Sequence, residues 1–339
     1  MKKHAIIPIF ISHRGCPHDC VFCNQKKITA RNGDVSPEDA RRTIDQHLST
    51  LEPIGVETIE IAFFGGSFTG IPMDEQKAFL EIAKEYKDSG RVKKIHLSTR
   101  PDYIDRVILD NLQSYSVDVI ELGVQSFNPE VLRLSERGHT PEIVYESSGL
   151  IKSYGFELGI QLMIGLPGDS LEKCLFSARE TVKVGPKIAR LYPTVVIKDT
   201  KLYDDFLSGD YRPLTEEEAV DRCKEMYLIL DSAGINIIRV GLKSSEIMES
   251  QTAFHPAFRQ LVEGRIAREQ LEKQLLELPG LSDPILRCSF LSNEKCLNNM
   301  FGHKGCNKKY FREKYPQVHI NYQGIPTLKD NEYKVEIAK

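Results

Sequence analysis

Short apolar runs alternate with helical patterns over most of this sequence, and this rhythm restricts the fold more than any other feature. Seven runs rich in β-branched residues are candidate strands: 5–12, 58–64, 94–98, 118–124, 156–164, 188–197 and 235–240. Two of the intervening helical segments begin with capping signals, at Ser36 before Pro37 and at Thr215 before Glu218. Nearly continuous apolar strands separated by helices are typical of a parallel sheet.

Six or seven such units favour a barrel over an open sheet, although periodicity alone does not separate the two. We therefore predict an α/β fold in which residues 1–245 form a partial (β/α)6 TIM-type barrel. The rhythm ends near Gly241, and we expect residues 246–339 to form a C-terminal helical or α+β extension.

The composition is that of an ordinary globular protein, since 41% of the 339 residues are hydrophobic and 27% are charged. The formal net charge of −3 gives no overall attraction to nucleic acid or to a membrane. The apolar run near the N-terminus is short and contains Pro8, so we interpret it as a buried strand and not as a signal peptide. No run approaches the roughly 18 apolar residues of a membrane span, and we expect a cytoplasmic protein without a membrane partner.

The last 55 residues, 285–339, differ in charge from the rest of the chain. They contain ten Lys or Arg and five Asp or Glu, so this tail carries +5 and the remainder −8. The ordinary interpretation is a solvated surface of mixed charge. The alternative is a contact surface for a polyanion such as RNA.

Three of the eight cysteines lie within eight residues, in the loop after the first predicted strand. Cys16, Cys20 and Cys23 form the pattern C-x3-C-x2-C. Three thiolates on a short loop suit an iron–sulfur cluster in which one iron has no protein ligand, and an open metal position is where chemistry takes place. The alternative is a zinc site with His13 or His18 as the fourth ligand.

This loop resembles the signature of the radical S-adenosylmethionine (SAM) superfamily, and Phe22 before the last cysteine is also typical of that family. The resemblance implies a [4Fe–4S] cluster on Cys16, Cys20 and Cys23, whose open iron binds the amino and carboxylate groups of SAM. One electron from the cluster would cleave SAM, and the resulting 5′-deoxyadenosyl radical would abstract hydrogen from the substrate. Such chemistry implies a low-potential electron donor, either flavodoxin or ferredoxin.

By the same resemblance, residues at the ends of the second and third strands bind SAM. Gly65, Gly66 and Ser67 resemble the motif that binds the methionyl amino group, and a tight turn is the alternative for the two glycines. Ser98 stands where relatives commonly place a carboxylate for the ribose hydroxyls. A serine hydroxyl keeps the ability to hydrogen-bond there.

Three further residues complete the implied SAM site. Gln125 ends the fourth strand and is expected to contact the ribose or adenine side of SAM. Arg137, twelve residues later, would hold a charged end of SAM, because a guanidinium suits a carboxylate; an arginine before glycine is otherwise more often a surface residue. Gln161 begins the segment 161–168 that closes the fifth strand, and relatives often have aspartate at its position.

Residues 98–102, 123–140 and 190–203 are similar to the catalytic subunit of the Elongator complex, an enzyme that modifies wobble uridine in transfer RNA. The similarity extends over about residues 6–240. The C-x3-C-x2-C spacing instead matches the oxygen-independent coproporphyrinogen oxidase branch, and residues 241–339 do not resemble an acetyltransferase domain.

The sequence thus predicts a radical SAM enzyme of unidentified substrate, with transfer RNA modification as the leading hypothesis. Tyr192, Lys198 and Tyr203 are expected to face the site, with burial as the alternative for the tyrosines. Two other functions stay open: a tetrapyrrole-directed or heme-handling protein of the coproporphyrinogen oxidase type, and a non-catalytic iron–sulfur or zinc module. We interpret the remaining clustered cysteines as ordinary thiols, with an auxiliary cluster as the alternative: Cys288, Cys296 and Cys306.

Overall fold

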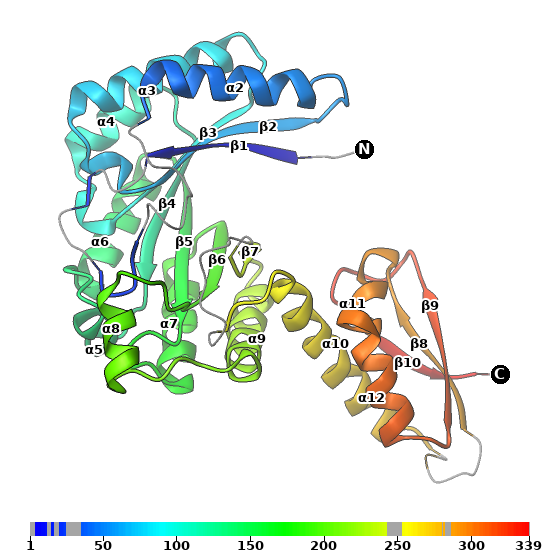
Figure 1. Ribbon diagram of the computed structural model, residues 1–339. Coiled ribbons are helices and arrows are strands. Elements are labelled where there is room, and N and C mark those ends of the chain that lie inside the picture. The colour runs from blue at the N-terminus through cyan, green and yellow to red at the C-terminus, as the bar shows by residue number, and fades with distance from the viewer. Residues whose placement is uncertain are drawn as a thin grey trace.

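The computed structural model describes residues 4–11, 15–16, 20–24, 35–242, 253–279, 281 and 286–338. Within them, seven parallel strands form one curved sheet in the order of the sequence (Figure 1). They are β1 (His4–Ile11), β2 (Thr58–Gly65), β3 (Lys94–Thr99), β4 (Val119–Gln125), β5 (Glu157–Ile164), β6 (Ile188–Pro193) and β7 (Asn236–Val240). The predicted α/β partial barrel is confirmed, with one strand more than the expected six, because β7 also pairs in parallel with β6.

Helices cover the convex side of this sheet (Figure 1). They are α2 (Pro37–Leu51), α3 (Met73–Asp88), α4 (Arg106–Ser114), α6 (Pro141–Ser153), α7 (Leu171–Val184) and α9 (Glu216–Ser232). Alternate residues of each strand point to opposite faces of the sheet. In β1, Ile7 and Ile9 are therefore buried, whereas Pro8 and Phe10 on the concave side are only partly buried.

The two predicted capping signals are confirmed. The Ser36 hydroxyl accepts a hydrogen bond from the Asp39 amide at the start of α2, and the Thr215 hydroxyl accepts one from the Glu218 amide at the start of α9. Both acidic side chains reach back to the amide of the capping residue, which completes a capping box in each helix.

Short elements follow the carboxyl ends of four strands and shape that edge of the sheet. They are η1 (Phe68–Gly70), η2 (Pro101–Tyr103), α5 (Pro129–Leu134) and α8 (Lys201–Ser208). Because the strands are parallel, all of these elements and the loop after β1 lie at the same edge. In parallel barrels this edge carries the active site.

The C-terminal extension packs on the barrel through α10 (Phe258–Leu276), which lies along α9. Lys224 Nζ lies 2.6 Å from a Glu269 oxygen across this contact. The Arg259 guanidinium donates to the Ile237 carbonyl oxygen of β7 at 3.0 Å. The division near residue 245 stays our proposal, because residues 243–252 lie outside the described part of the chain.

Beyond α10 the extension contains a small mixed sheet, so the predicted α+β character is confirmed. Its strands have the order β10-β8-β9, with β9 parallel and β10 antiparallel to β8. The strands are β8 (Leu286–Ser292), β9 (Val318–Gly324) and β10 (Lys334–Ile337). Between β8 and β9 lie η3 (Glu294–Cys296), α11 (Leu297–Phe301), η4 (His303–Gly305) and α12 (Cys306–Lys314).

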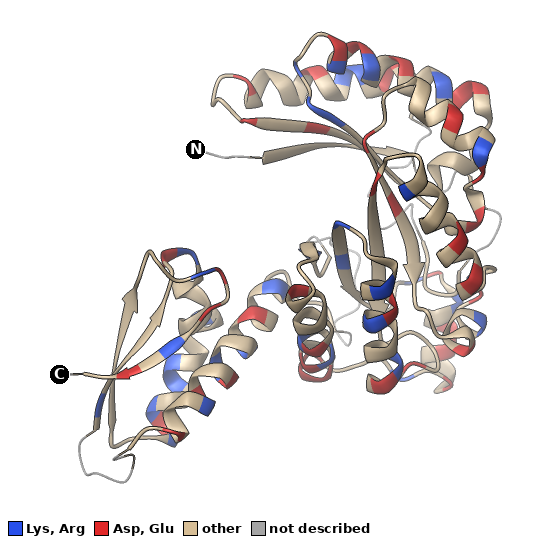
Figure 2. Cartoon of the chain, turned by 180° about the vertical axis from the view of Figure 1, so that it is seen from behind, with Lys and Arg blue, Asp and Glu red and all other residues tan. Residues whose placement is uncertain are grey.

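Acidic and basic residues are interspersed along the helices that cover the barrel sheet (Figure 2). This distribution agrees with the small net charge of the whole chain. Among the described helices, none combines the length and the apolar character that crossing a membrane requires.

Candidate active site

The cysteine loop follows β1 at the carboxyl edge of the sheet. Cys20 is buried, Cys16 and Cys23 are half-buried, and the Cys23 amide donates to the Cys20 carbonyl oxygen at 2.9 Å. Within the described residues none of the eight cysteines forms a disulfide bond. Among the same described residues, no three His, Cys, Asp or Glu side chains are arranged to hold a metal ion in this structure. The alternative zinc ligands His13 and His18 lie outside the described residues.

Backbone contacts fix this loop on the turn after β2. A Cβ atom on Gly15 would lie 2.1 Å from the Ser67 carbonyl oxygen, and a Cβ on Gly70 would lie 2.2 Å from the Gly15 carbonyl oxygen. Gly15 also has a φ of +72°, a conformation that glycine adopts without strain. The loop and the turn therefore touch backbone to backbone, with no room for a side chain at either glycine.

The predicted Gly65-Gly66-Ser67 motif is this turn. Gly65 has a φ of +112°, and the Gly66 amide donates to the Ile11 carbonyl oxygen at 2.8 Å, so the motif also joins β1 to β2. The Ser67 hydroxyl is buried and hydrogen-bonds to a threonine hydroxyl of β3 at 2.8 Å. The Ser67 backbone lies beside the Cys16 thiol. The motif is thus a tight turn, and its position is next to the cysteine loop.

Two buried arginines lie beside the cysteines. Arg137 donates from Nη1 to Cys20 Sγ at 3.1 Å and from Nη2 to the Gly123 carbonyl oxygen at 2.5 Å. Arg100 forms a bidentate ion pair with Asp102 and donates from Nη2 to the Arg137 carbonyl oxygen at 2.6 Å. Nη1 of Arg100 and Nε of Arg137 are buried without a hydrogen-bond partner among the described residues. Buried donors are seldom left unpaired, and these two indicate a ligand at this place.

The two guanidinium groups dominate the electrostatics around the loop. Burial raises the pKa of the Cys16 thiol, while Arg100 and Arg137 oppose that shift. His139 is buried nearby, and burial together with the Arg137 charge lowers the pKa of His139 to about 4. His139 is therefore neutral at pH 7, and the arginines supply the positive charge that an anionic ligand would meet.

Gln125 lies at the end of β4 with a φ of +69°, in the left-handed region that glutamine rarely occupies. The β4–β5 pairing is irregular at this point. A Cβ on Gly123 would lie 3.0 Å from Gln125 Nε2 and 3.6 Å from Arg137 Nη2. Both side chains therefore pack against Gly123, in the space that a side chain there would occupy. The structure thus brings Gln125, Arg137 and Cys20 together. Backbone strain of this kind concentrates at binding sites.

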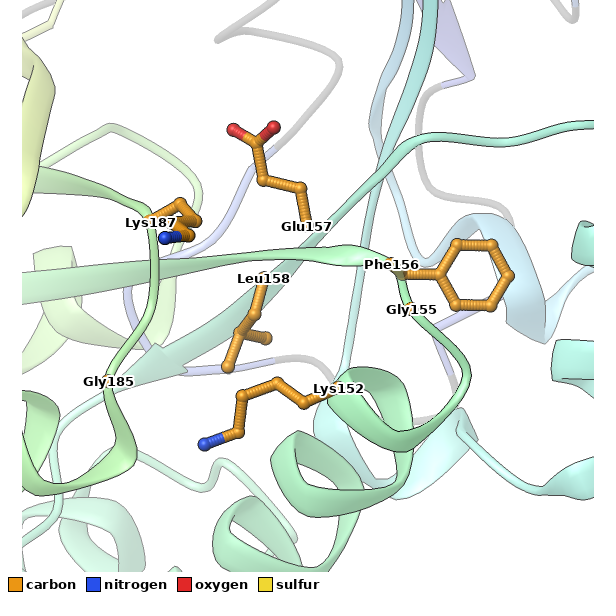
Figure 3. Close-up of a pocket in the computed structure, with 7 residues that line it drawn as sticks. All are labelled: Lys152, Gly155, Phe156, Glu157, Leu158, Gly185 and Lys187. Carbon is orange, nitrogen blue, oxygen red and sulfur yellow. The ribbon is translucent and has the colours of Figure 1, made fainter.

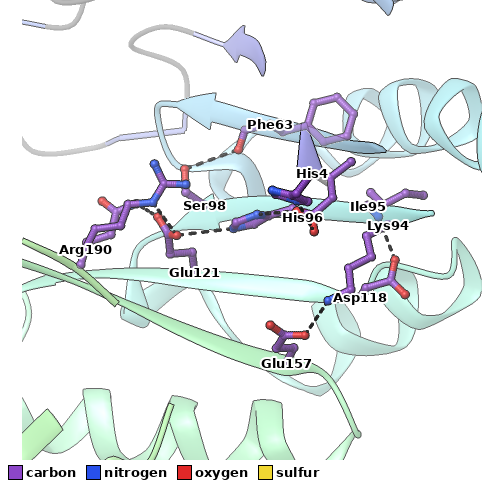
Figure 4. A network of polar contacts seen from close by, with 12 residues as sticks. His4, Phe63, Lys94, Ile95, His96, Ser98, Asp118, Glu121, Glu157 and Arg190 are labelled. Carbon is purple, nitrogen blue, oxygen red and sulfur yellow. Dashed lines mark hydrogen bonds and ion pairs between the residues drawn. The ribbon is translucent and has the colours of Figure 1, made fainter. Parts of the chain in front are cut away.

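Ser98 lies on the concave side of the sheet, near a polar network around Glu121 (Figure 4). Gln161 belongs to the same network. Glu121 is fully buried and accepts hydrogen bonds from Gln161 Nε2 and from Arg190 Nε, the latter at 2.7 Å. His96 Nε2 lies 3.5 Å from the same carboxylate. Burial opposes ionisation of Glu121, but Arg190 and His96 lower its pKa to about 2. The Gln161 side chain is therefore bound to the barrel interior and not to the cysteine loop.

The residues expected to face substrate lie in three different settings. Tyr192 belongs to the polar network around Glu121, where its hydroxyl accepts a hydrogen bond from the Arg190 guanidinium at 3.3 Å. Lys198 is exposed on the segment after β6. Tyr203 and Phe22 pack in one small hydrophobic cluster, which joins the cysteine loop to the segment around α8. Phe22 therefore contributes to anchoring the loop.

Sequence reasoning missed Arg100 and Glu121. Arg100 directly follows β3, at the same strand end as Ser98, and that position was the available signal. Glu121 interrupts an otherwise apolar strand, where a charged residue requires a buried partner. Its partner Arg190 is 69 residues away in sequence, so the pair is not recognisable without the fold.

A shallow cavity of about 320 Å³ lies elsewhere, at the amino ends of β5 and β6 (Figure 3). Its lining residues are Lys152, Gly155, Phe156, Glu157, Leu158, Gly185 and Lys187. This is the edge opposite the cysteine loop, and in barrels that edge serves stability more than catalysis. The sequence left an auxiliary cluster open for three further cysteines, Cys288, Cys296 and Cys306. Within the described part of the chain they do not form a metal-binding group.

Comparisons with protein families match almost all of the barrel. Residues 10–179 match the radical SAM superfamily, and residues 186–268 match the radical SAM C-terminal domain. The first of these segments contains the cysteine loop, Arg100, Gln125 and Arg137.

Individual relatives match about two thirds of this chain. A tRNA uridine(34) acetyltransferase of Methanocaldococcus jannaschii is 28% identical over 256 residues, which cover 64% of this chain and 47% of the relative. Elongator complex protein 3 of Dictyostelium discoideum is 30% identical over 266 residues, which cover 64% of this chain and 46% of the relative. The chain thus spans about half the length of these relatives. Among solved structures, the archaeal Elp3 of Methanocaldococcus infernus superimposes with a TM-score of 0.64 at 22% identity, over 80% of this chain and 64% of that one.

Proposed function

Because the chain belongs to the radical SAM superfamily, and is therefore an enzyme of that class, we propose that Cys16, Cys20 and Cys23 hold a [4Fe–4S] cluster that binds SAM. The observation that carries the proposal is the contact of the Arg137 guanidinium with the Cys20 thiol, beside buried N–H groups without partners. These residues fit the group, since three thiols on one loop can ligate iron and adjacent cations balance thiolate charge. When bound, the cluster would supply the low-potential electron for reductive cleavage of SAM.

The chain's own residues would position SAM at the carboxyl edge of the sheet. The unpaired donors of Arg100 and Arg137 suit the SAM carboxylate. The turn that contains Gly65 and Gly66 leads to Ser67, whose backbone lies beside the Cys16 thiol. Gln125 and Arg137 both lie beside Gly123. Ser98 and Gln161 would act at greater distance, through the polar network around Glu121. Phe22 would act by holding the cysteine loop in place. Ser67 would act through its backbone.

We propose transfer RNA as the substrate. Two observations support it: the names of the relatives refer to tRNA uridine modification and to Elongator, and each of these relatives matches 64% of this chain. The chain spans only about half the length of those relatives. We therefore do not extend their acetyltransferase activity or their partners to this chain. The tetrapyrrole alternative keeps only the cysteine spacing in its favour.

The proposal includes a flavodoxin or a ferredoxin as electron donor, because reductive SAM cleavage needs a low-potential electron. It also places the enzyme in the cytoplasm, where reducing conditions keep thiols available for iron.

The test is an anaerobic reaction of the full, iron-reconstituted chain with SAM, dithionite and unmodified tRNA transcripts, followed by mass spectrometry of the digested nucleosides. We expect a new modified nucleoside that depends on SAM and is absent with the Cys20→Ala variant. Unchanged tRNA in the presence of SAM cleavage would contradict the tRNA proposal while leaving the chemistry intact. Conversion of a porphyrinogen under the same conditions would favour the tetrapyrrole alternative.

A further inference from the structure

The excess positive charge of the extension is concentrated in one short segment. The described residues 286–338 contain nine Lys or Arg and five Asp or Glu. Residues 303–314, which comprise η4 and α12, contain five of these basic residues and one of the acidic ones. The rest of 286–338 holds four of each sign, so it is neutral, and the whole excess of +4 lies on η4 and α12. A solvated surface of mixed charge would not be divided in this way.

Two of the four basic residues outside this segment form ion pairs, and so do two of the five inside it. Lys295 lies 3.3 Å from Asp330, and Lys334 lies 3.2 Å from Glu332. Two of the α12 residues are also paired, Lys309 with Glu313 and Lys314 with Glu272. The other three are exposed and form no ion pair with any described residue: Lys304, Lys308 and Arg312. Lys308 and Arg312 are four residues apart and so share one face of α12.

Aromatic rings lie directly beside these cations. Lys308 Nζ is 3.6 Å from the ring centre of Phe301 and 5.1 Å from that of Tyr322. The two rings meet edge to face at 5.3 Å, and both are half-buried, so part of each ring is open to solvent. Exposed cations next to accessible rings are the combination by which proteins hold phosphates and stack bases of single-stranded nucleic acid.

The apolar side of α12 is already occupied, which argues against a membrane as the partner. Phe311 is fully buried and packs edge to face on Phe290 of β8. Tyr315, just after the helix, is buried and donates to Glu272. A helix that inserts into a bilayer surface needs a free apolar face, and α12 has none to offer. The outward face offers charge and ring edges.

We propose that η4 and α12, through Lys304, Lys308 and Arg312, bind the phosphate backbone of the RNA substrate. This inference rests on the proposed function, which supplies RNA as the substrate class. It also goes beyond that function, because residues 269–338 lie outside both segments that match the family. The extension would hold the body of the RNA while the barrel acts on one nucleotide.

The test measures binding of a fluorescein-labelled, unmodified tRNA transcript to the full chain by fluorescence anisotropy between 50 and 200 mM salt. The variant K304Q/K308Q/R312Q removes the three exposed cations. The matched control K295Q/K329Q/K334Q removes three positive charges from elsewhere in the same extension. A second variant, K304R/K308R, keeps the charge. Circular dichroism and thermal unfolding check that each protein is folded.

We expect the K304Q/K308Q/R312Q variant to bind at least tenfold more weakly at 100 mM salt. The slope of log K against log salt should become shallower by about 2 to 3, since each lost phosphate contact removes about 0.7 to 0.9. The control and the arginine variant should bind like wild type. Equal binding by wild type and the triple variant, equal loss in the control, or no RNA binding at all would each overturn the inference.

Failure of this inference is distinguishable from failure of the proposed function. Formation of 5′-deoxyadenosine from SAM is measured on the same proteins without RNA, and the extension variants should not change it. If wild type cleaves SAM but the RNA-binding measurements give any of the contradicting results above, only the inference about η4 and α12 fails. If wild type binds RNA through this surface but neither holds iron nor cleaves SAM, the inference stands and the proposed chemistry fails.

Discussion

At the scale of single residues, Arg137 connects three parts of the candidate site. Its guanidinium touches the Cys20 thiol and the Gly123 carbonyl oxygen, and its own carbonyl oxygen accepts from Arg100. The resemblance predicted Arg137 from its spacing to Gln125, and the structure places both side chains over the same glycine. Arg100 was not predicted, because the contact that joins it to Arg137 is made to a backbone carbonyl oxygen, which the sequence does not identify.

Arg137→Ala should weaken SAM binding by about 10- to 100-fold, because a charge-assisted hydrogen bond contributes about 1.5–3 kcal/mol. Isothermal titration of SAM into the reconstituted protein measures this effect. Arg133→Ala is the matched control, since Arg133 is exposed on α5 a few residues away and should leave SAM binding unchanged. Wild-type affinity in Arg137→Ala would remove Arg137 from the SAM site.

Glu121→Gln should destabilise the fold by about 3–5 kcal/mol, because it leaves the Arg190 guanidinium buried without its counter-charge. The pKa of Glu121 is lowered to about 2 in the folded state, against about 4.3 in an unfolded chain. Its ionised form therefore stabilises the fold above about pH 5, and this contribution is lost as the pH falls toward 2. Urea unfolding of both proteins should show a constant difference from pH 6 to 8 that shrinks below pH 5. A difference that grows in acid would contradict this account.

At the scale of elements, the sequence placed the strands and their ends well, because apolar β-branched runs and helix caps are local signals. It could not decide which way the side chains at those ends point. Gln161 lies within a predicted strand, and its partner Glu121 is 40 residues away in the sequence, so the hydrogen bond that holds Gln161 in the barrel is not recognisable from the sequence. Asp102, which follows β3, pairs with Arg100, whereas Asp105 caps α4.

Gly15→Ala should displace the cysteine loop, because the added Cβ would meet backbone of the turn after β2 at 2.1 Å. We expect the iron content after reconstitution to fall by more than half while the far-ultraviolet dichroism stays that of wild type. Gly149→Ala in α6 is the control, since nothing lies within 4 Å of its Cβ position, and alanine there should stabilise the helix by about 0.8–1 kcal/mol. Full iron loading of Gly15→Ala would show that the loop tolerates the displacement.

At the scale of the whole molecule, barrel and extension share one hydrophobic core. Val262 and Ile266 of α10 belong to the same buried cluster as the barrel strands and as Phe290 of the extension. The sequence predicted an extension from the end of the strand rhythm, but it could not show this shared core, because the contacts join segments far apart in the chain.

Thermal unfolding of the full chain should therefore show a single cooperative transition. Differential scanning calorimetry, with comparison of the calorimetric and van't Hoff enthalpies, measures this. Two separated transitions would mean that the parts on either side of residue 245 fold independently, which the shared core does not predict.

The central claim is that the cysteine loop holds a cluster that cleaves SAM. The most direct measurement is anaerobic: reconstitute the full chain with iron and sulfide, determine iron per chain, add SAM and dithionite, and quantify 5′-deoxyadenosine. The account predicts about four irons per chain and SAM cleavage, both lost in Cys20→Ala. A protein that binds zinc and no iron, or one that holds four irons and yields no 5′-deoxyadenosine with or without RNA, would contradict it.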